Sequence, residues 1–124
     1  MIATRPPAVA GMFYPGDPDT LSTTVDNLLA ESAGPADSQP KALIVPHAGY
    51  IYSGATAATA YATLAPWAAS IRRVILLGPT HRVAVEGIAL PEAEAFATPL
   101  GTIRLDAQAI TVIASLPQIV FSDQ

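Results

Sequence analysis

Two short apolar segments, each closed by a proline and followed by a histidine, constrain the fold of this 124-residue chain more than any other feature. Residues 42–45 are followed by Pro46-His47, and residues 74–77 are followed by Gly78-Pro79-Thr80-His81. Short runs that are apolar at every position are typical of strands buried on both faces of a parallel sheet. The sequence therefore predicts two buried strands with a histidine just beyond each carboxyl end.

Helical patterns lie around these two segments. Asp17 followed by Pro18 predicts the cap and first residue of a helix that ends before Gly34. Ser53 is expected to cap a helix over residues 54–64, and Asp106 a helix over about 107–116. Short strands are expected at residues 87–90, 101–105 and 119–121, with a turn at 98–101. This alternation predicts an α/β fold with a mostly parallel sheet and helices on both faces.

The order strand, helix, strand over residues 42–77 predicts a right-handed βαβ unit, in which both strands end at one edge of the sheet. Neighbouring strand ends lie about 4.8 Å apart, and metal–nitrogen bonds of roughly 2.1 Å fit that spacing. His47 and His81, the two histidines of the chain, are therefore predicted to share one metal ion. Two ligands are not a complete catalytic site, which usually takes three from the protein.

Composition excludes several classes of partner. The net charge is −4 and basic residues do not cluster, so we expect neither a nucleic-acid groove nor an anionic membrane surface. Cysteine is absent, which excludes disulfides and a cysteine nucleophile in these residues and favours a cytoplasmic location. The chain is 51% hydrophobic and 13% charged, a high ratio for a small protein. Either its strands are deeply buried or a partner is missing, and association through an exposed sheet edge would supply that partner.

Four segments resemble the Memo family, which includes the bacterial AmmeMemoRadiSam system protein B. They are residues 9–15 (VAGMFYP), 45–54 (VPHAGYIYSG), 77–81 (LGPTH) and 98–101 (TPLG), the last followed by Asp106. The resemblance covers nearly the whole chain. It implies a single Memo-like domain over residues 1–124, the amino-terminal half of the expected fold. That fold is similar to the class III extradiol dioxygenases, and the chain would be a truncated form of it.

The resemblance also implies a metal pocket. His47 and His81 match two metal-site histidines of the family, with iron(II) or copper as the implied cofactor. Phe13 falls where relatives carry an aromatic residue of the pocket, Tyr52 matches a pocket tyrosine, and Gly49 and Tyr50 join them as ligand-binding residues. The third metal position, a cysteine, and a further pocket histidine lie in the portion of the family that has no counterpart here.

Three functions follow as hypotheses. The first is a metal-dependent, dioxygenase-like oxidoreductase, in which neutral imidazoles bind the metal, so that binding weakens as the pH falls. The second is a non-catalytic module that binds a phosphotyrosine-type peptide or a small anionic ligand in the same pocket, since family members have been regarded as adaptors. The third is hydrolysis with Ser53 or Thr80 as nucleophile, although no G-x-S-x-G elbow is present. No catalytic residue is assigned, and whether the chain is an enzyme stays open.

Overall fold

The structure, a computed structural model, describes residues 1–32, 34 and 36–122 and divides the chain into two compact units. Unit 1 comprises Met1–Pro7 and Arg73–Gln124, and unit 2 comprises Ala8–Arg72. Unit 2 contains helices, whereas unit 1 contains strands and one helix. The α/β class predicted from the sequence is confirmed. The single domain expected over residues 1–124 stays a prediction.

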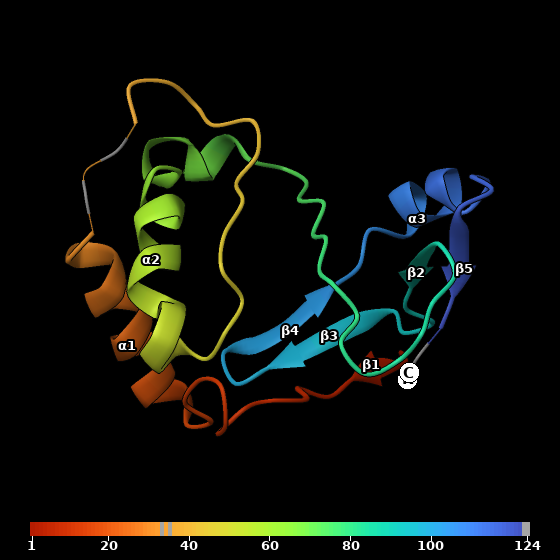
Figure 1. The fold of residues 1–124 in the computed structure, drawn as a ribbon, viewed down its shortest axis with the longest axis horizontal. Coiled ribbons are helices and arrows are strands. Elements are labelled where there is room, and N and C mark those ends of the chain that lie inside the picture. The colour runs from red at the N-terminus through yellow and green to blue at the C-terminus, as the bar shows by residue number, and fades with distance from the viewer. Residues whose placement is uncertain (33, 35, 123–124) are drawn as a thin grey trace. The chain divides into compact units, whose positions relative to one another are not determined.

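Unit 2 is built on two packed helices, α1 (Pro18–Ala30) and α2 (Tyr50–Ala62), followed by a short 3₁₀ helix, η1 (Ala65–Ser70) (Figure 1). Asp17 caps α1 as predicted, and its carboxylate accepts hydrogen bonds from the Thr20 amide at 2.8 Å and the Thr20 hydroxyl at 2.7 Å. These bonds lower the pKa of Asp17. The helices approach closely at Gly54, where an added Cβ would lie 3.2 Å from the Leu28 Cδ1 atom.

Helix α2 begins four residues earlier than expected. Its N-cap is Gly49, so the prediction that Ser53 caps a helix over residues 54–64 is wrong. The Ser53 hydroxyl is buried and donates instead to the Ala48 carbonyl at 2.9 Å. The earlier start is possible because the Phe13 carbonyl accepts a hydrogen bond from the Tyr50 amide, one of the amides that a helix terminus leaves without a partner in the helix.

Unit 1 contains two small sheets. In the first, β1 (Thr4–Arg5) pairs in parallel with β3 (Ala95–Thr98), which forms an antiparallel hairpin with β4 (Gly101–Arg104). In the second, β2 (Ile88–Leu90) pairs in parallel with β5 (Ile119–Phe121). Pairing is therefore mostly parallel, as predicted. The strands expected at 87–90, 101–105 and 119–121 and the turn at 98–101 are confirmed, whereas β1 and β3 were not anticipated.

Helix α3 (Ala107–Ile113) lies between β4 and β5 along the chain, and Asp106 caps it as predicted. The Asp106 carboxylate accepts hydrogen bonds from the Ala109 amide at 2.9 Å and from Arg73 Nε at 2.6 Å. Both interactions favour the carboxylate and lower the pKa of Asp106, the amide being the larger cause.

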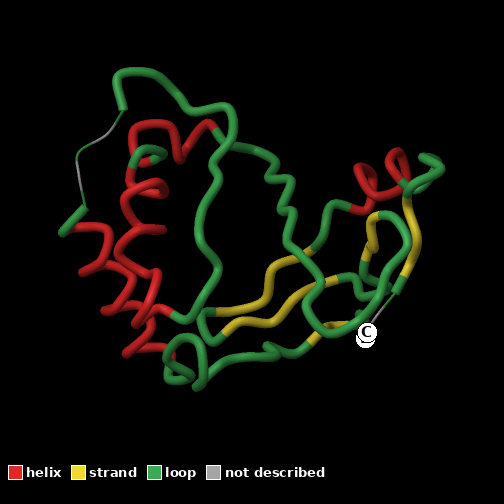
Figure 2. Tube along the Cα trace, viewed as in Figure 1, coloured by secondary structure: helices red, strands yellow, loops and turns green. Residues whose placement is uncertain are grey.

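The two apolar segments that precede His47 and His81 do not form strands. Residues 42–45 and 74–77 are described as irregular chain, and the long connections that contain them are drawn as loops in Figure 2. The βαβ unit predicted over residues 42–77 is therefore wrong for the structure described. The physical reason is that a strand requires a hydrogen-bonded neighbour, and the apolar pattern reports only that a segment is suited to burial.

No helix in the part of the chain that the structure describes is both long enough and apolar enough to cross a membrane.

Candidate functional site

Three of the predicted pocket residues come together at the start of α2. The Tyr50 amide donates a hydrogen bond to the Phe13 carbonyl at 2.7 Å. A Cβ added at Gly49 would lie 3.4 Å from the same carbonyl oxygen, an ordinary contact distance. The rings of Tyr14 and Tyr50 are tilted by 43° with centroids 5.8 Å apart. Tyr14 was not singled out from the sequence, although it directly follows Phe13.

A tight turn over residues 9–14 holds Phe13 in place. The Phe13 amide donates to the Val9 carbonyl at 2.9 Å, and the Gly11 amide donates to the Tyr14 carbonyl at 2.8 Å. Gly11 has a φ of +79°, in the left-handed region that glycine adopts without strain. The Phe13 side chain is 46% exposed, and its backbone carbonyl contacts the first turn of α2.

His47 lies two residues before the N-cap of α2 and is exposed. The carbonyl of the next residue, Ala48, accepts the hydrogen bond from the buried Ser53 hydroxyl. The backbone that carries His47 is therefore tied to α2 immediately after the histidine. This hydrogen bond gives the buried Ser53 hydroxyl a structural role, so its presence does not require a role as a nucleophile.

The aromatic residues of the site differ in their surroundings. Tyr52 is 83% exposed, whereas Tyr50 is partly buried. Burial raises the pKa of the Tyr50 phenol, and the neighbouring phenols of Tyr14 and Tyr61 raise it further. The Tyr50 hydroxyl therefore stays neutral at physiological pH and is able both to donate and to accept a hydrogen bond.

The second predicted metal ligand, His81, lies in unit 1 and is also exposed. Its convergence with His47 was inferred from two paired strands that the structure does not contain, and it stays a prediction. In residues 1–32, 34 and 36–122, no group of three or more His, Cys, Asp or Glu side chains is placed to hold a metal ion.

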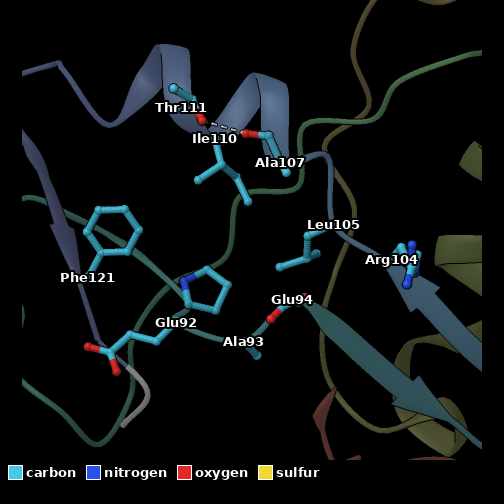
Figure 3. Close-up of a pocket in the computed structure, with 10 residues that line it drawn as sticks. Glu92, Ala93, Glu94, Arg104, Leu105, Ala107, Ile110, Thr111 and Phe121 are labelled. Atoms are coloured by element: carbon cyan, nitrogen blue, oxygen red, sulfur yellow. Dashed lines mark hydrogen bonds between the residues drawn. The ribbon is translucent and has the colours of Figure 1, made fainter. Parts of the chain in front are cut away.

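Unit 1 contains a cavity of about 510 Å³ beneath α3 that sequence reasoning did not anticipate. Figure 3 shows Ile110, Leu105 and Phe121 around this space, with the Glu92 carboxylate extending away from the helix. None of the predicted site residues lines it. No local sequence signal marks the cavity, because its walls come from β5, α3 and the chain on either side of the β3–β4 hairpin. The lining residues are Pro91, Glu92, Ala93, Glu94, Arg104, Leu105, Ala107, Ile110, Thr111 and Phe121.

The helices and the small, mostly parallel sheets define a mixed α/β protein. Comparison with known proteins identifies its family. The family model described as "Memo-like protein" matches residues 5–124. A MEMO1 family protein of Aquifex aeolicus (strain VF5) is 39% identical over 113 residues, which cover 91% of this chain and 40% of that protein. A MEMO1 family protein of Ignicoccus hospitalis is 35% identical, covering 96% of this chain and 45% of the relative. Protein MEMO1 of Danio rerio is 41% identical over 100 residues, which cover 78% of this chain and 32% of that protein.

This chain belongs to the Memo family and corresponds to the amino-terminal part of its members. It spans less than half the length of these curated relatives. The resemblance stated from the four sequence segments is therefore confirmed.

Proposed function

We propose that this chain supplies two imidazole ligands, His47 and His81, to the metal site of a dioxygenase-like redox protein that uses iron(II) or copper. Membership of the Memo family supports the proposal, and so does the equivalent position of the two histidines after apolar segments that end in proline. A cytoplasmic location, expected from the lack of cysteine, belongs to the same proposal.

The observation that carries the proposal is the fixed backbone on the carboxyl side of His47. The Ser53 hydroxyl holds the Ala48 carbonyl, and the Phe13 carbonyl holds the Tyr50 amide. A ligand carried on a constrained backbone loses less conformational entropy when it binds a metal than one on a free loop. The carbonyl of Phe13 binds the same helix terminus, and its half-exposed side chain could shield one side of a bound ligand from water.

The residues of this chain would form part of the metal site. They would contribute two neutral nitrogen ligands, an aromatic wall and the neutral Tyr50 hydroxyl as a hydrogen-bonding group. A bound iron or copper ion would supply oxygen activation or electron transfer. The third ligand would come from polypeptide that corresponds to the remainder of the longer relatives. The proposal therefore covers metal binding by this chain and assigns turnover to the complete site.

Metal titration of the chain tests the two histidines. We expect calorimetry with Fe(II) under anaerobic conditions, and separately with Cu(II), to detect one site per chain. The variants His47→Ala and His81→Ala should each weaken binding by at least about 10–100-fold, because losing a direct ligand costs at least as much as losing its supporting partner. Binding by the unchanged chain should also weaken as the pH is lowered, because protons compete for the imidazoles.

Glu86→Gln is the matched control, since Glu86 is an exposed carboxylate five positions after His81 that the proposal does not use. Equal metal content in the unchanged chain and in the double variant His47→Ala/His81→Ala would contradict the proposal. Loss of binding in the Glu86→Gln variant alone would contradict the assigned ligands.

A second candidate function is favoured by the exposure of Phe13 and Tyr52 beside the start of α2. In this alternative the aromatic side chains and the amides of the helix terminus receive a phosphotyrosine-type peptide without turnover. The same proteins can be titrated with a phosphotyrosine peptide and its unphosphorylated form. Saturable binding of the phosphorylated peptide that survives the double histidine substitution would favour this alternative over the metal site.

A further inference from the structure

Tyr14 and Tyr50 bring two phenol rings together at the start of α2. Their ring centroids lie 5.8 Å apart and the ring planes are tilted by 43°, a separation at which aromatic rings are in contact. Burial and then the phenol of Tyr14 raise the pKa of Tyr50, which indicates that the hydroxyl groups are near each other as well as the rings. The contact therefore joins the phenol groups of two residues that lie far apart in the sequence.

The backbone holds both rings in place. The Gly11 amide donates a hydrogen bond to the Tyr14 carbonyl at 2.8 Å, which fixes Tyr14 at the end of the turn over residues 9–14. The Tyr50 amide donates to the carbonyl of Phe13, the residue directly before Tyr14, at 2.7 Å. The two phenols are thus carried on backbones that are hydrogen-bonded beside them. Groups held together in this way react as if each were present at a very high local concentration.

The four tyrosines of the chain differ in how far solvent reaches them. Tyr14 and Tyr50 are partly buried, whereas the side chains of Tyr52 and Tyr61 are 83% and 46% exposed. A phenoxyl radical on an exposed side chain can meet another molecule, whereas one formed on Tyr14 or Tyr50 is in contact with a second phenol. Because the chain has no cysteine, an oxidative cross-link within it has to use another kind of side chain.

We propose that Tyr14 and Tyr50 form an oxidative modification site, at which a one-electron oxidant couples the two phenols into dityrosine. Each phenol loses one electron to the oxidant and one proton to water, which leaves a phenoxyl radical. The two radicals combine through ring carbons adjacent to the oxygens, and the hydrogen on each coupled carbon then moves to the oxygen and restores the phenol. Two equivalents of oxidant are reduced for each carbon–carbon bond formed.

The product joins the turn over residues 9–14 covalently to α2. This inference does not rest on the proposed metal site, because the oxidant comes from outside the protein and the reaction needs no metal ligand.

Photo-oxidation of the 124-residue chain tests the site. The chain is kept dilute in the presence of EDTA and illuminated briefly with tris(bipyridyl)ruthenium(II) and persulfate, which generate a one-electron oxidant. We expect the fluorescence of dityrosine to appear in the monomeric chain, with Tyr14 joined to Tyr50 as the main product in mass spectra of its proteolytic fragments. The cross-linked chain should unfold at a higher temperature than the untreated chain, because the new bond restricts the unfolded state, as a disulfide does.

Substitutions by phenylalanine identify the partners. Tyr14→Phe and Tyr50→Phe each keep the ring and remove the phenol, so each should lower the yield of the cross-link within one chain at least about tenfold. Tyr61→Phe is the matched control, because it removes a phenol near the other end of α2, and it should leave the yield unchanged. Circular dichroism checks that each variant is folded. In the unchanged chain, unfolding by urea should abolish the preference for the link between Tyr14 and Tyr50.

Three results would overturn the proposal. One is the absence of a link between Tyr14 and Tyr50 while Tyr52 couples between molecules, which would show that exposure decides which phenols react. Another is the same yield of cross-link within one chain in the folded Tyr14→Phe variant as in the unchanged chain. The third is an equal yield of the link between Tyr14 and Tyr50 with and without urea, which would show that the contact in the fold is not needed.

Discussion

At the scale of single residues, the candidate site depends on two backbone carbonyls and the groups that bind them. The Phe13 carbonyl accepts from the Tyr50 amide, and the Ala48 carbonyl accepts from the buried Ser53 hydroxyl. These two bonds connect the turn before α1 and the loop after His47 to the same helix terminus. A hydrogen bond of this kind contributes little to net stability, but its loss leaves a polar group without its partner.

Ser53→Ala tests the second of these bonds. We expect the free energy of unfolding to fall by about 1 kcal/mol, because the substitution removes a buried donor from the Ala48 carbonyl. Urea denaturation followed by circular dichroism measures the change. Ser115→Ala is the matched control, since the exposed Ser115 hydroxyl donates to the Val112 carbonyl at 2.8 Å, and it should change stability by less than about 0.5 kcal/mol. Equal effects of the two substitutions would contradict the role assigned to Ser53.

At the scale of elements, neighbouring residues in the sequence were sufficient to predict helix caps and turns. They were not sufficient to predict which distant segments pair as strands. Asp17 and Asp106 were recognised as helix caps because the cap is formed within three residues. The turn at residues 98–101 was recognised for the same reason. In contrast, β1 has only two residues and exists because it pairs with β3 far along the chain. Ser53 was misassigned as a cap because the Phe13 carbonyl, distant in sequence, allows α2 to start earlier.

Gly87→Ala tests the element formed by β2 and β5. Gly87 has a φ of +93°, and an added Cβ would lie 2.2 Å from the Gln118 carbonyl oxygen, which accepts a hydrogen bond from the Ile88 amide. We expect destabilisation of about 2 kcal/mol or more, from the left-handed backbone and from displacement of the partner strand. Amide exchange at Ile88 and Val120 in urea measures it.

Gly78→Ala is the control for this substitution, because Gly78 has no positive φ and an added Cβ there would meet no atom within 4 Å. It should be neutral or slightly stabilising, since alanine restricts the unfolded chain. A Gly87→Ala variant as stable as the Gly78→Ala variant would contradict the close approach at Gln118.

At the scale of the whole molecule, the apolar runs at residues 42–45 and 74–77 predict more burial than these segments have in the structure. The α/β class, the mostly parallel pairing and the family were all predicted from the sequence. The two strands expected at 42–45 and 74–77 were not observed, because in the part of the chain that the structure describes neither segment pairs with the other or with another strand. Convergence of His47 and His81 depends on those strands, which is why the metal site stays a proposal.

This view of the whole chain predicts how it behaves alone in solution. We expect the 124-residue chain to enhance the fluorescence of the dye ANS, because residues 74–77 and other large apolar side chains are exposed. The double variant Ile75→Asp/Leu76→Asp should reduce the enhancement while the far-ultraviolet circular dichroism remains unchanged. No fluorescence increase with the unchanged chain would contradict the exposure of these segments.

The parallel pairing of β1 with β3 has a consequence for the order of folding during synthesis. During synthesis Thr4 precedes its partner Ala95 by about ninety residues. The hairpin of β3 and β4 closes over a two-residue loop and is expected to form quickly once it emerges, whereas β1 must find β3 by closing a long loop. Strand β1 is therefore made well before its partner and is among the last elements of unit 1 to pair, so that until then its backbone lacks the hydrogen bonds of the sheet.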